Sequence, residues 1–185
     1  AAAIAQKVDA PVKLVWSRED DVAHDFFRPG GYYRVRAGVD ASGKLAAYIS
    51  HSVNFTREGK IVQGDEVAGN AFALTVAPHT RVEFSKIETT IPTGYLRAPV
   101  SNALAFVHET FCDEIAHGAG QDPIAFRLAH LNAHIDDYNG DRFGGYNPER
   151  MRAVLKTVEE RSGWRSRASG KGEGMGVATY FSHHG

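Results

Sequence analysis

The residues best suited to do chemistry lie in one stretch, Thr93-Gly94-Tyr95-Leu96-Arg97-Ala98-Pro99-Val100-Ser101-Asn102. Its composition predicts the end of a strand, a tight turn and the start of a helix near Ala103, with Ser101 or Asn102 as the N-cap. Free amides and the positive end of the helix dipole converge at such a junction, and Arg97 adds a permanently charged fork of donors. The stretch therefore suits the binding of an anion or an oxo group. The alternative is an ordinary strand-to-helix connection in which Arg97 forms a surface ion pair.

Three other patterns resemble reactive sites but fit ordinary structural roles better. His130 and His134 have the i, i+4 spacing of a metal-binding pair, yet the glutamate of an HExxH motif is absent. The adjacent acids at 19–21 are typical of a solvated turn or a helix cap rather than of paired catalytic carboxylates. The glycine-rich run at 170–176 lacks both the dinucleotide fingerprint and the Gly-Lys-Ser/Thr ending of a P-loop. We therefore favour the structural role for each of the three.

Length and charge limit the classes of function. The chain has 185 residues, 43% of them hydrophobic, which is enough for one domain with a core. Lys and Arg number 21 and Asp and Glu number 22, so the net charge of −1 creates no strong field for nucleic acid or an anionic membrane. The single cysteine, Cys112, excludes an internal disulfide and a multi-cysteine metal cage, and no apolar run reaches the ~20 residues of a membrane span. Both ends look cut, so we expect an excerpt of a longer protein.

The elements that position this stretch are predicted from hydrophobic periodicity. Apolar and polar residues alternate, as is typical of strands, in part at 12–17 and within 31–55, and the second of these contains turn residues that predict a hairpin. Further strands are predicted at 82–91 and 174–182. Apolar residues recur every three or four positions in segments that begin near residues 102, 123 and 148, which predicts three helices. Loops are predicted at 56–77, with room for one short helical turn, and at 134–146.

These elements predict an α+β fold. We expect a mixed or antiparallel sheet that contains the N-terminal hairpin and is covered by three helices. The predicted organisation is one region in three parts: strand-rich at 8–100, helix-rich at 101–163, and a terminal strand at 174–182. Because the predicted sheet lacks strands at both ends, we expect exposed apolar surface and unpaired edges, together with self-association.

Several separated motifs resemble a known family. They comprise the run at 11–21, Arg28-Pro29, Tyr33-Arg34-Val35, the stretch at 93–101, Phe111-Cys112-Asp113-Glu114-Ile115-Ala116, and Gly120-Gln121-Asp122-Pro123-Ile124-Ala125-Phe126-Arg127. In this order they resemble the molybdopterin-binding large subunit of the xanthine dehydrogenase and aldehyde oxidase family, the molybdenum hydroxylases. The sequence of these motifs is most similar to the branch typified by the isoquinoline 1-oxidoreductase β subunit. The resemblance covers nearly the whole chain.

The resemblance implies roles for the central stretch. In purine hydroxylases of this family a Phe-Arg-Gly-Phe-Gly loop approaches the molybdenum oxo ligand, and here the same place reads Leu96-Arg97-Ala98-Pro99-Val100. Leu96, Arg97 and Ala98 are therefore implied to bind the cofactor, and Pro99 and Val100 to line the substrate pocket. Pro99 replaces an aromatic ring, and residues 63–68 contain no substrate-orienting arginine, so a purine-like substrate is disfavoured. The general-base glutamate of the family is expected outside these residues.

The resemblance also implies a cofactor and partners. The complete enzyme would use molybdopterin, in its cytosine dinucleotide form, with molybdenum to oxidise an N-heteroaromatic compound or an aldehyde with water as the oxygen donor. Its partners would be the remaining segments of the same subunit and a small iron–sulfur subunit, in a bacterial periplasmic or membrane-associated location rather than the cytoplasm. The chain by itself is expected to be inactive and to retain no cofactor.

Two other functions remain open. The chain could be a noncatalytic α+β interaction module that docks a partner's carboxylate through the turn at Arg97. It could also be a hydrolase that uses the acids at 19–21. Molybdenum content and a dye-linked oxidation assay on the full-length protein discriminate among the three.

Overall fold

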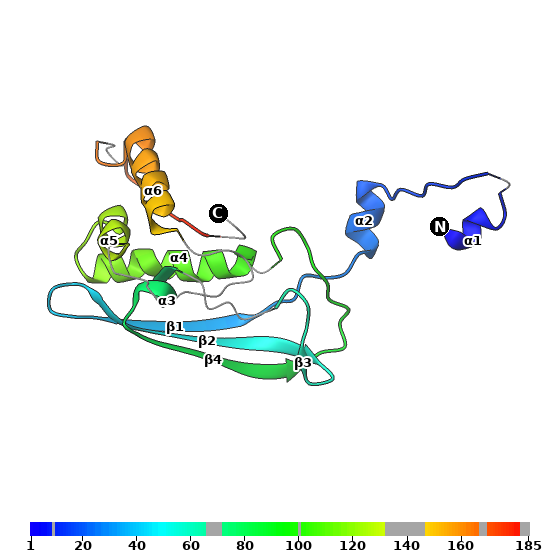
Figure 1. Cartoon of the computed structure of the whole chain (residues 1–185), viewed down its shortest axis with the longest axis horizontal. Coiled ribbons are helices and arrows are strands. Elements are labelled where there is room, and N and C mark those ends of the chain that lie inside the picture. The colour runs from blue at the N-terminus through cyan, green and yellow to red at the C-terminus, as the bar shows by residue number, and fades with distance from the viewer. Residues whose placement is uncertain (9, 66–71, 100, 132–146, 167–169, 182–185) are drawn as a thin grey trace.

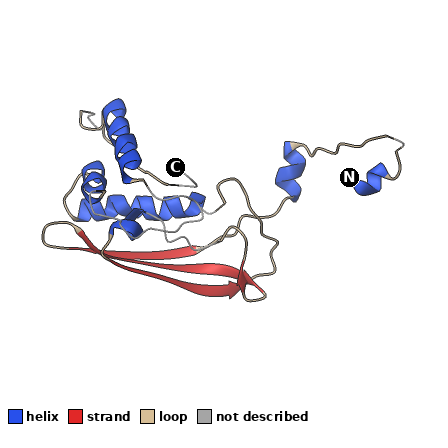
Figure 2. Cartoon of the chain, viewed as in Figure 1, coloured by secondary structure: helices blue, strands red, loops and turns tan. Residues whose placement is uncertain are grey.

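The computed structural model describes residues 1–8, 10–65, 72–99, 101–131, 147–166 and 170–181. Figure 1 shows one sheet with helices gathered on one of its faces, and an N-terminal arm, residues 1–29, that extends away from this body. Figure 2 shows that the strands lie in a single layer. The α+β class predicted from the sequence is confirmed. Within the described residues, no helix is long and apolar enough to cross a membrane.

The hairpin predicted at 31–55 is confirmed. Strands β1 (Tyr32–Val39) and β2 (Leu45–Arg57) pair antiparallel. The turn between them is closed by Asp40, whose Oδ1 accepts from the amides of Ser42 at 2.8 Å and Lys44 at 3.0 Å. Gly43 has φ +79°, which a residue with a side chain rarely adopts. Local turn chemistry and alternation therefore agree on this element.

The remaining strands make the sheet mixed. Strand β4 (His79–Glu88) pairs parallel with β2, and the two-residue β3 (Lys60–Ile61) pairs antiparallel with the end of β2. The helix α3 (Phe72–Val76) lies in the connection from β3 to β4. The loop predicted at 56–77 thus contains the expected short helix, and the strand predicted at 82–91 begins three residues earlier.

The three predicted longer helices are present: α4 (Ser101–Gly118), α5 (Pro123–His130) and α6 (Pro148–Ser162). Helix α4 lies on the sheet, α5 packs on α4, and α6 packs on α5. Asp122 caps α5 by accepting from the amides of Ile124 and Ala125, and Asn147 caps α6 by accepting from that of Arg150. Proline follows each cap at the first helical position, where its missing N–H costs no hydrogen bond. The loop predicted at 134–146 lies outside the described residues.

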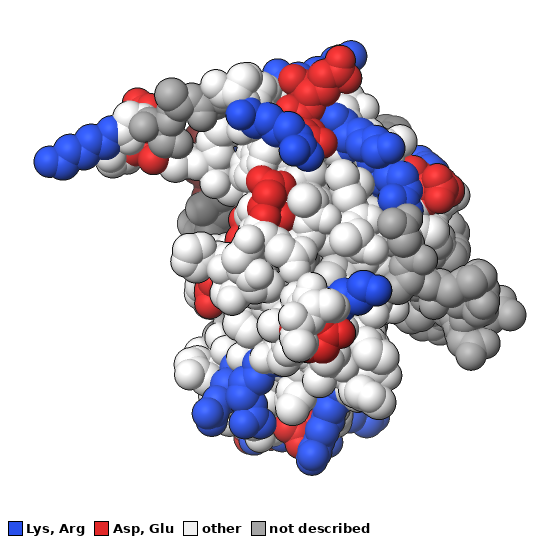
Figure 3. Space-filling model, turned by 90° about the vertical axis from the view of Figure 1, so that its left-hand side faces the viewer, with Lys and Arg blue, Asp and Glu red and all other residues white. Residues whose placement is uncertain are grey.

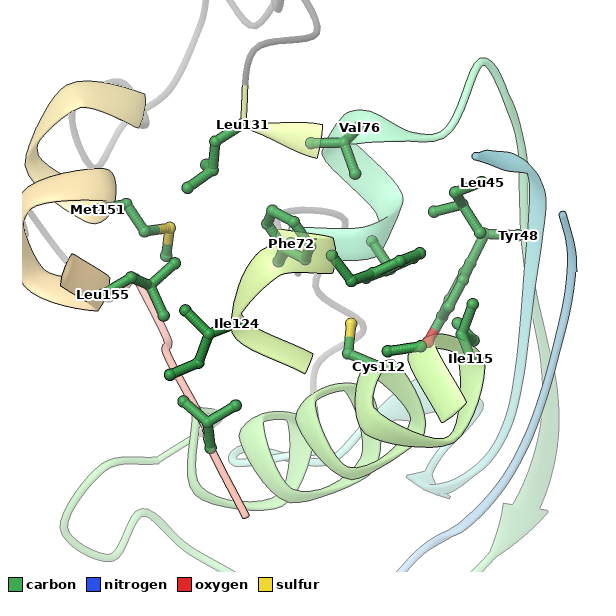
Figure 4. Close-up of a cluster of buried hydrophobic side chains, with 14 of the residues drawn as sticks. Leu45, Tyr48, Phe72, Val76, Cys112, Ile115, Ile124, Leu131, Met151 and Leu155 are labelled. Carbon is green, nitrogen blue, oxygen red and sulfur yellow. The ribbon is translucent and has the colours of Figure 1, made fainter. Parts of the chain in front are cut away.

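One hydrophobic core joins the sheet to the helices (Figure 4). Each covering helix contributes its apolar face, and burial of one such side chain stabilises the fold by roughly 1.5–3 kcal/mol. The labelled members are Leu45 and Tyr48 from the sheet, Phe72 and Val76 from α3, and Cys112, Ile115, Ile124, Leu131, Met151 and Leu155 from the helical layer.

The strand predicted at 12–17 is wrong, because residues 11–17 are extended but belong to no strand. The acids at 19–21 that follow lie in a helix, α2 (Arg18–His24), rather than in a turn. Ser17 and Asp20 form a capping box, in which each side chain accepts from the other residue's amide. A short helix, α1 (Ala2–Ala5), precedes this part of the arm. Alternation predicted a strand at 12–17, but no described strand lies beside it.

The terminal strand predicted at 174–182 is also wrong for its described part, residues 174–181. The segment is extended, yet main-chain groups of Val177 and Thr179 bond to side chains of helices instead of to another strand. The backbone of residues 174–181 is thus extended but is not part of the sheet.

Charged groups of both signs share the surface. On the face that Figure 3 presents, groups of Lys and Arg alternate with Asp and Glu, and uncharged surface separates them. This distribution agrees with the near-zero net charge and gives no continuous basic stripe on that face.

Candidate functional site

The stretch predicted to do chemistry forms a turn, residues 93–99, which we call the Arg97 turn. It lies between the end of the sheet and the start of α4 (Figure 1). The turn is attached to the arm, because the amide of Phe27 donates to the carbonyl of Pro92 at 3.0 Å and the amide of Gly94 donates to the carbonyl of Phe27 at 3.1 Å. A Cβ at Gly94 would lie 2.9 Å from that of Phe26, so glycine is required by the close approach of the two segments.

A single side chain fixes the carbonyl side of the turn. The guanidinium of Arg28 donates to three consecutive carbonyl oxygens, those of Arg97 at 2.5 Å, Ala98 at 3.2 Å and Pro99 at 2.8 Å. Ala98 has φ +56°, the left-handed conformation that few residues other than glycine adopt. The planar fork of one arginine therefore holds a strained turn by its oxygen atoms.

Two amides of the turn, those of Arg97 and Ala98, are not used by the described structure. Within the described part of the chain, no acceptor bonds the amides of Arg97 and Ala98, and the exposed Arg97 guanidinium has no ion-pair partner. Thr93 Oγ1 is buried and also lacks a hydrogen-bond partner among the described residues. Donors without acceptors gather on one turn, so the site has the polarity needed to bind an anion or an oxo group.

The start of α4 lies beside these donors. The helix begins at Ser101, and the amide of Asn102 donates to the carbonyl of Ala98 at 3.4 Å. The prediction that Ser101 or Asn102 is the N-cap is therefore wrong, because both residues are already helical. The residue that precedes the helix, 100, lies outside the described residues. The positive end of the α4 dipole adds to the field at the turn.

The predicted site residues that the structure describes differ in their exposure to solvent. Leu96 is 52% exposed, Arg97 and Ala98 are exposed, and Pro99 is half-buried, all within the one turn. Val100 lies outside the described residues. The residue that the sequence analysis missed is Arg28. Its one signal was that Arg28-Pro29 belongs to the motifs of the family resemblance.

The histidine pair is not a metal site as far as the structure describes it. The buried His130 accepts the amide of Leu45 at Nε2, 2.8 Å away, so its Nδ1 proton is directed to the carbonyl of Phe126 at 2.7 Å. Both ring nitrogens are occupied by main chain, while His134 lies outside the described residues. In the part of the chain with described positions, no cluster of three or more His, Cys, Asp or Glu side chains is arranged to hold a metal ion.

A second polar pair is buried under α4. The Tyr48 hydroxyl and His108 Nδ1 lie 2.7 Å apart, and both side chains are almost fully buried. Burial lowers the pKa of His108 to about 4 and raises that of Tyr48, and it raises the pKa of the Cys112 thiol to about 12. All three groups are thus neutral near pH 7, and their place in the core indicates a structural role.

An α+β body presents, at one turn, the unbonded amides of Arg97 and Ala98, an exposed guanidinium and the start of a helix, a combination that suits an anionic or oxo-bearing ligand. Comparison with known families narrows the class of ligand. The model of the molybdopterin cofactor-binding domain matches residues 1–131, and the chain belongs to this family. The resemblance found in the sequence is thereby confirmed.

Curated relatives agree with the family. The chain is 28% identical over 193 residues to the isoquinoline 1-oxidoreductase subunit beta of Brevundimonas diminuta, with 98% of this chain and 23% of the relative covered. It is 29% identical to the membrane-bound aldehyde dehydrogenase (pyrroloquinoline-quinone) of Gluconacetobacter polyoxogenes, with 96% and 25% covered. It is 28% identical to the aldehyde oxidoreductase molybdenum-binding subunit PaoC of Escherichia coli (strain K12), with 100% and 26% covered.

The chain thus spans about a quarter of the length of these relatives. A solved structure of the aldehyde oxidoreductase from Desulfovibrio gigas gives a TM-score of 0.47 at 16% identity, over 72% of this chain and 15% of that one.

Proposed function

We propose that this chain is part of the molybdopterin-binding subunit of a molybdenum hydroxylase that oxidises an N-heteroaromatic compound or an aldehyde with water as the oxygen donor. Membership of the molybdopterin cofactor-binding domain family supports the cofactor. The names of relatives support the substrate classes, since they include an isoquinoline oxidoreductase and an aldehyde oxidoreductase. One relative's name carries pyrroloquinoline quinone instead, and the family match favours molybdopterin over it.

The observation that carries the proposal is the polarity of the Arg97 turn. Arg28 engages the carbonyls of residues 97–99, so the main-chain groups left for a ligand are the amides of Arg97 and Ala98. Amides and a guanidinium bind oxo and phosphate oxygens through charge-assisted hydrogen bonds. The unpartnered Thr93 Oγ1 supplies one further polar atom at the same turn. The residues present therefore fit the oxygen-rich surface of the proposed cofactor.

Each residue of the turn has a defined part in the proposal. We assign Leu96, Arg97 and Ala98 to cofactor binding: the amides of Arg97 and Ala98 would donate to the cofactor, and the Arg97 guanidinium would add its positive charge. Pro99 and Val100 line the substrate pocket, where proline gives an apolar wall but no ring on which a purine could stack. When bound, molybdenum supplies the centre that transfers oxygen from water to the substrate carbon.

The rest of the site belongs to the remainder of the subunit. Because the chain spans about a quarter of its relatives, we assign the general-base glutamate and most of the pterin-binding loops to other segments of the full-length protein. The cytosine dinucleotide form of the cofactor and a small iron–sulfur partner subunit complete the proposal. Cofactor binding requires all of these segments together.

The test uses the full-length protein isolated from its natural host. We expect about one molybdenum per subunit by metal analysis, and dye-linked oxidation of an aldehyde or an N-heterocycle. A full-length protein without molybdenum and without this oxidation would contradict the proposal. It would favour the alternative that the free Arg97 guanidinium docks a carboxylate of a partner protein.

A further inference from the structure

Residues 174–181 form an extended segment that lies along α4, and charged side chains of α4 and α5 hold it there (Figure 1). The amide of Val177 donates to Asp113 Oδ2 at 3.3 Å, and the amide of Thr179 donates to Glu109 Oε2 at 2.9 Å. Arg127 Nη2 donates to the carbonyl of Val177 at 3.2 Å. Three side chains thus bind main chain only, and they contact it where a neighbouring strand would.

The spacing of these contacts follows from two regular structures. Glu109 and Asp113 are four residues apart on a helix, which places their carboxylates about 6 Å apart along its axis. The amides of Val177 and Thr179 are two residues apart in an extended chain and point to the same edge, about 6.7 Å apart. The two repeats match over one step, so one face of α4 binds one edge of the extended segment through its main chain, while the side chain of Val177 packs into the hydrophobic core.

The binding groups are also held by one another. Arg127 is fully buried, and its Nε and Nη2 lie 3.2 Å and 3.1 Å from Glu109 Oε2, while its Nη1 lies 2.6 Å from Asp113 Oδ1. The carbonyls of Glu109 and Pro123 accept from the same guanidinium at 2.9 Å and 3.2 Å. Arg127 therefore fixes both carboxylates, and we call Glu109, Asp113 and Arg127 the main-chain clamp.

The order of the contacts gives the segment a direction. Val177 lies at Asp113 and Thr179 lies at Glu109, one helical turn nearer the start of α4. The segment therefore runs antiparallel to the helix, toward the end that follows the Arg97 turn. A continued step of two residues for each turn would bring Phe181 opposite Ala105, close to the first turn of α4.

We propose that the main-chain clamp is a receptor for an extended strand whose occupant is the segment 177–179, and that it leads this segment to the end of α4 that carries the Arg97 turn. Glu109, Asp113 and Arg127 are then positioning residues for the cofactor site. The receptor role stands on the contacts alone. The delivery to the Arg97 turn rests on the proposed function.

The receptor role is tested by hydrogen exchange on the full-length protein. Thr179→Pro removes the amide that Glu109 accepts, whereas Ala178→Pro, the matched control, removes an amide on the opposite edge. We expect Thr179→Pro to increase exchange at Val177 roughly ten- to hundred-fold, and Ala178→Pro to leave it within about twofold. Asp113→Ala at a partly exposed position should have the same effect as Thr179→Pro, with the exposed Glu114→Ala as its control. Unchanged exchange in both test variants would overturn the receptor.

The delivery is tested by the molybdenum content of the same proteins. The delivery is supported if the molybdenum content falls in Thr179→Pro and stays at the wild-type level in Ala178→Pro. A wild-type content in Thr179→Pro, with faster exchange at Val177, overturns the delivery and leaves the receptor. A wild-type protein that holds no molybdenum contradicts the proposed function instead, and the exchange data still decide on the clamp.

Discussion

The guanidinium of Arg28 lies 2.8 Å from the carbonyl oxygen of Pro99, a residue 71 positions further along the chain. The same side chain also reaches the carbonyls of Arg97 and Ala98, so the carbonyl oxygens of residues 97, 98 and 99 are all directed to one cation. The amides of Arg97 and Ala98 remain without an acceptor within the described residues. The carbonyl oxygens of residues 97–99 thus bind an internal cation, while two neighbouring amides stay available for the ligand that we propose.

Replacement of Arg28 should loosen the turn without unfolding the body. Arg28→Ala removes three charge-assisted hydrogen bonds at a half-buried position, which should cost about 1–2 kcal/mol. Arg28→Lys should restore a part of this, because one ammonium cannot follow the three carbonyls as a planar fork does. Hydrogen exchange at residues 96–99 measures the effect. Equal exchange in the wild type and in Arg28→Ala would show that another contact holds the turn.

Gly94→Ala should separate the turn from the arm. The added Cβ would lie 2.9 Å from the Cβ of Phe26, which cannot move away without its backbone, so we expect a loss of roughly 1–3 kcal/mol. Gly38→Ala is the matched control, since a Cβ at Gly38 meets no atom within 4 Å. Chemical denaturation of the two variants gives the comparison. Equal stabilities would mean that residues 26–28 do not pack on Gly94 in solution.

The buried His108 should make stability fall in acid. Its pKa is lowered to about 4 by burial, whereas the unfolded chain has the ordinary value near 6.5. Between these values the unfolded state binds a proton that the folded state refuses, so the free energy of unfolding decreases as pH falls from 6.5 to 4. The decrease should reach roughly 2–3 kcal/mol, and above pH 6.5 this contribution is constant.

The variant that isolates this effect is His108→Asn, whose amide oxygen can still accept the hydrogen bond of the Tyr48 hydroxyl. Tyr48 and Cys112 remain protonated throughout this range, because burial raises the pKa of both. We expect the variant to be less stable at pH 7 and to have a flatter pH dependence between 4 and 6.5. Urea unfolding at several pH values measures both. Parallel curves for the two proteins would exclude His108 as the source of the acid sensitivity.

The 185-residue chain should self-associate. Val82 and Phe84 on β4 are 41% and 49% exposed, and within the described residues β4 pairs on one edge only, with β2. Exposed apolar residues on an unpaired edge strand favour association between chains. Light scattering should report a mass that rises with concentration, and Phe84→Lys should reduce this rise. A monomer of constant mass at all concentrations would contradict the prediction.

Sequence periodicity predicted those elements whose partners lie within the chain. The hairpin at 31–55 pairs with itself, and proline with a preceding cap residue marked the starts of α5 and α6. The strand at 12–17 was predicted by the same alternation and is absent, because a strand is defined by a neighbour and the described structure places none beside these residues. The strand predicted at 174–182 is absent from residues 174–181 for a different reason. There the side chains of the main-chain clamp bond the extended backbone where a neighbouring strand would.

The site was predicted only in part. Composition located the Arg97 turn, because arginine, a tight turn and a helix start follow one another in the sequence. Arg28 could not be assigned a role, since its three acceptors are main-chain carbonyls, and a carbonyl gives no signal in a sequence. The same holds for Arg127, which binds the carbonyl of Val177. Contacts between a side chain and distant backbone depend on the tertiary fold.

The measurement that tests the central claim most directly is the molybdenum content and steady-state turnover of the full-length protein with Arg97→Ala. If the Arg97 turn binds the cofactor, turnover or molybdenum occupancy should fall by roughly 10²–10³-fold, as for the loss of one charged donor. Arg97→Lys should restore only a part, because a point ammonium lacks the planar fork. Wild-type turnover with full molybdenum in Arg97→Ala, together with a stability change of at most about 1 kcal/mol, would show that this side chain is only a surface cation.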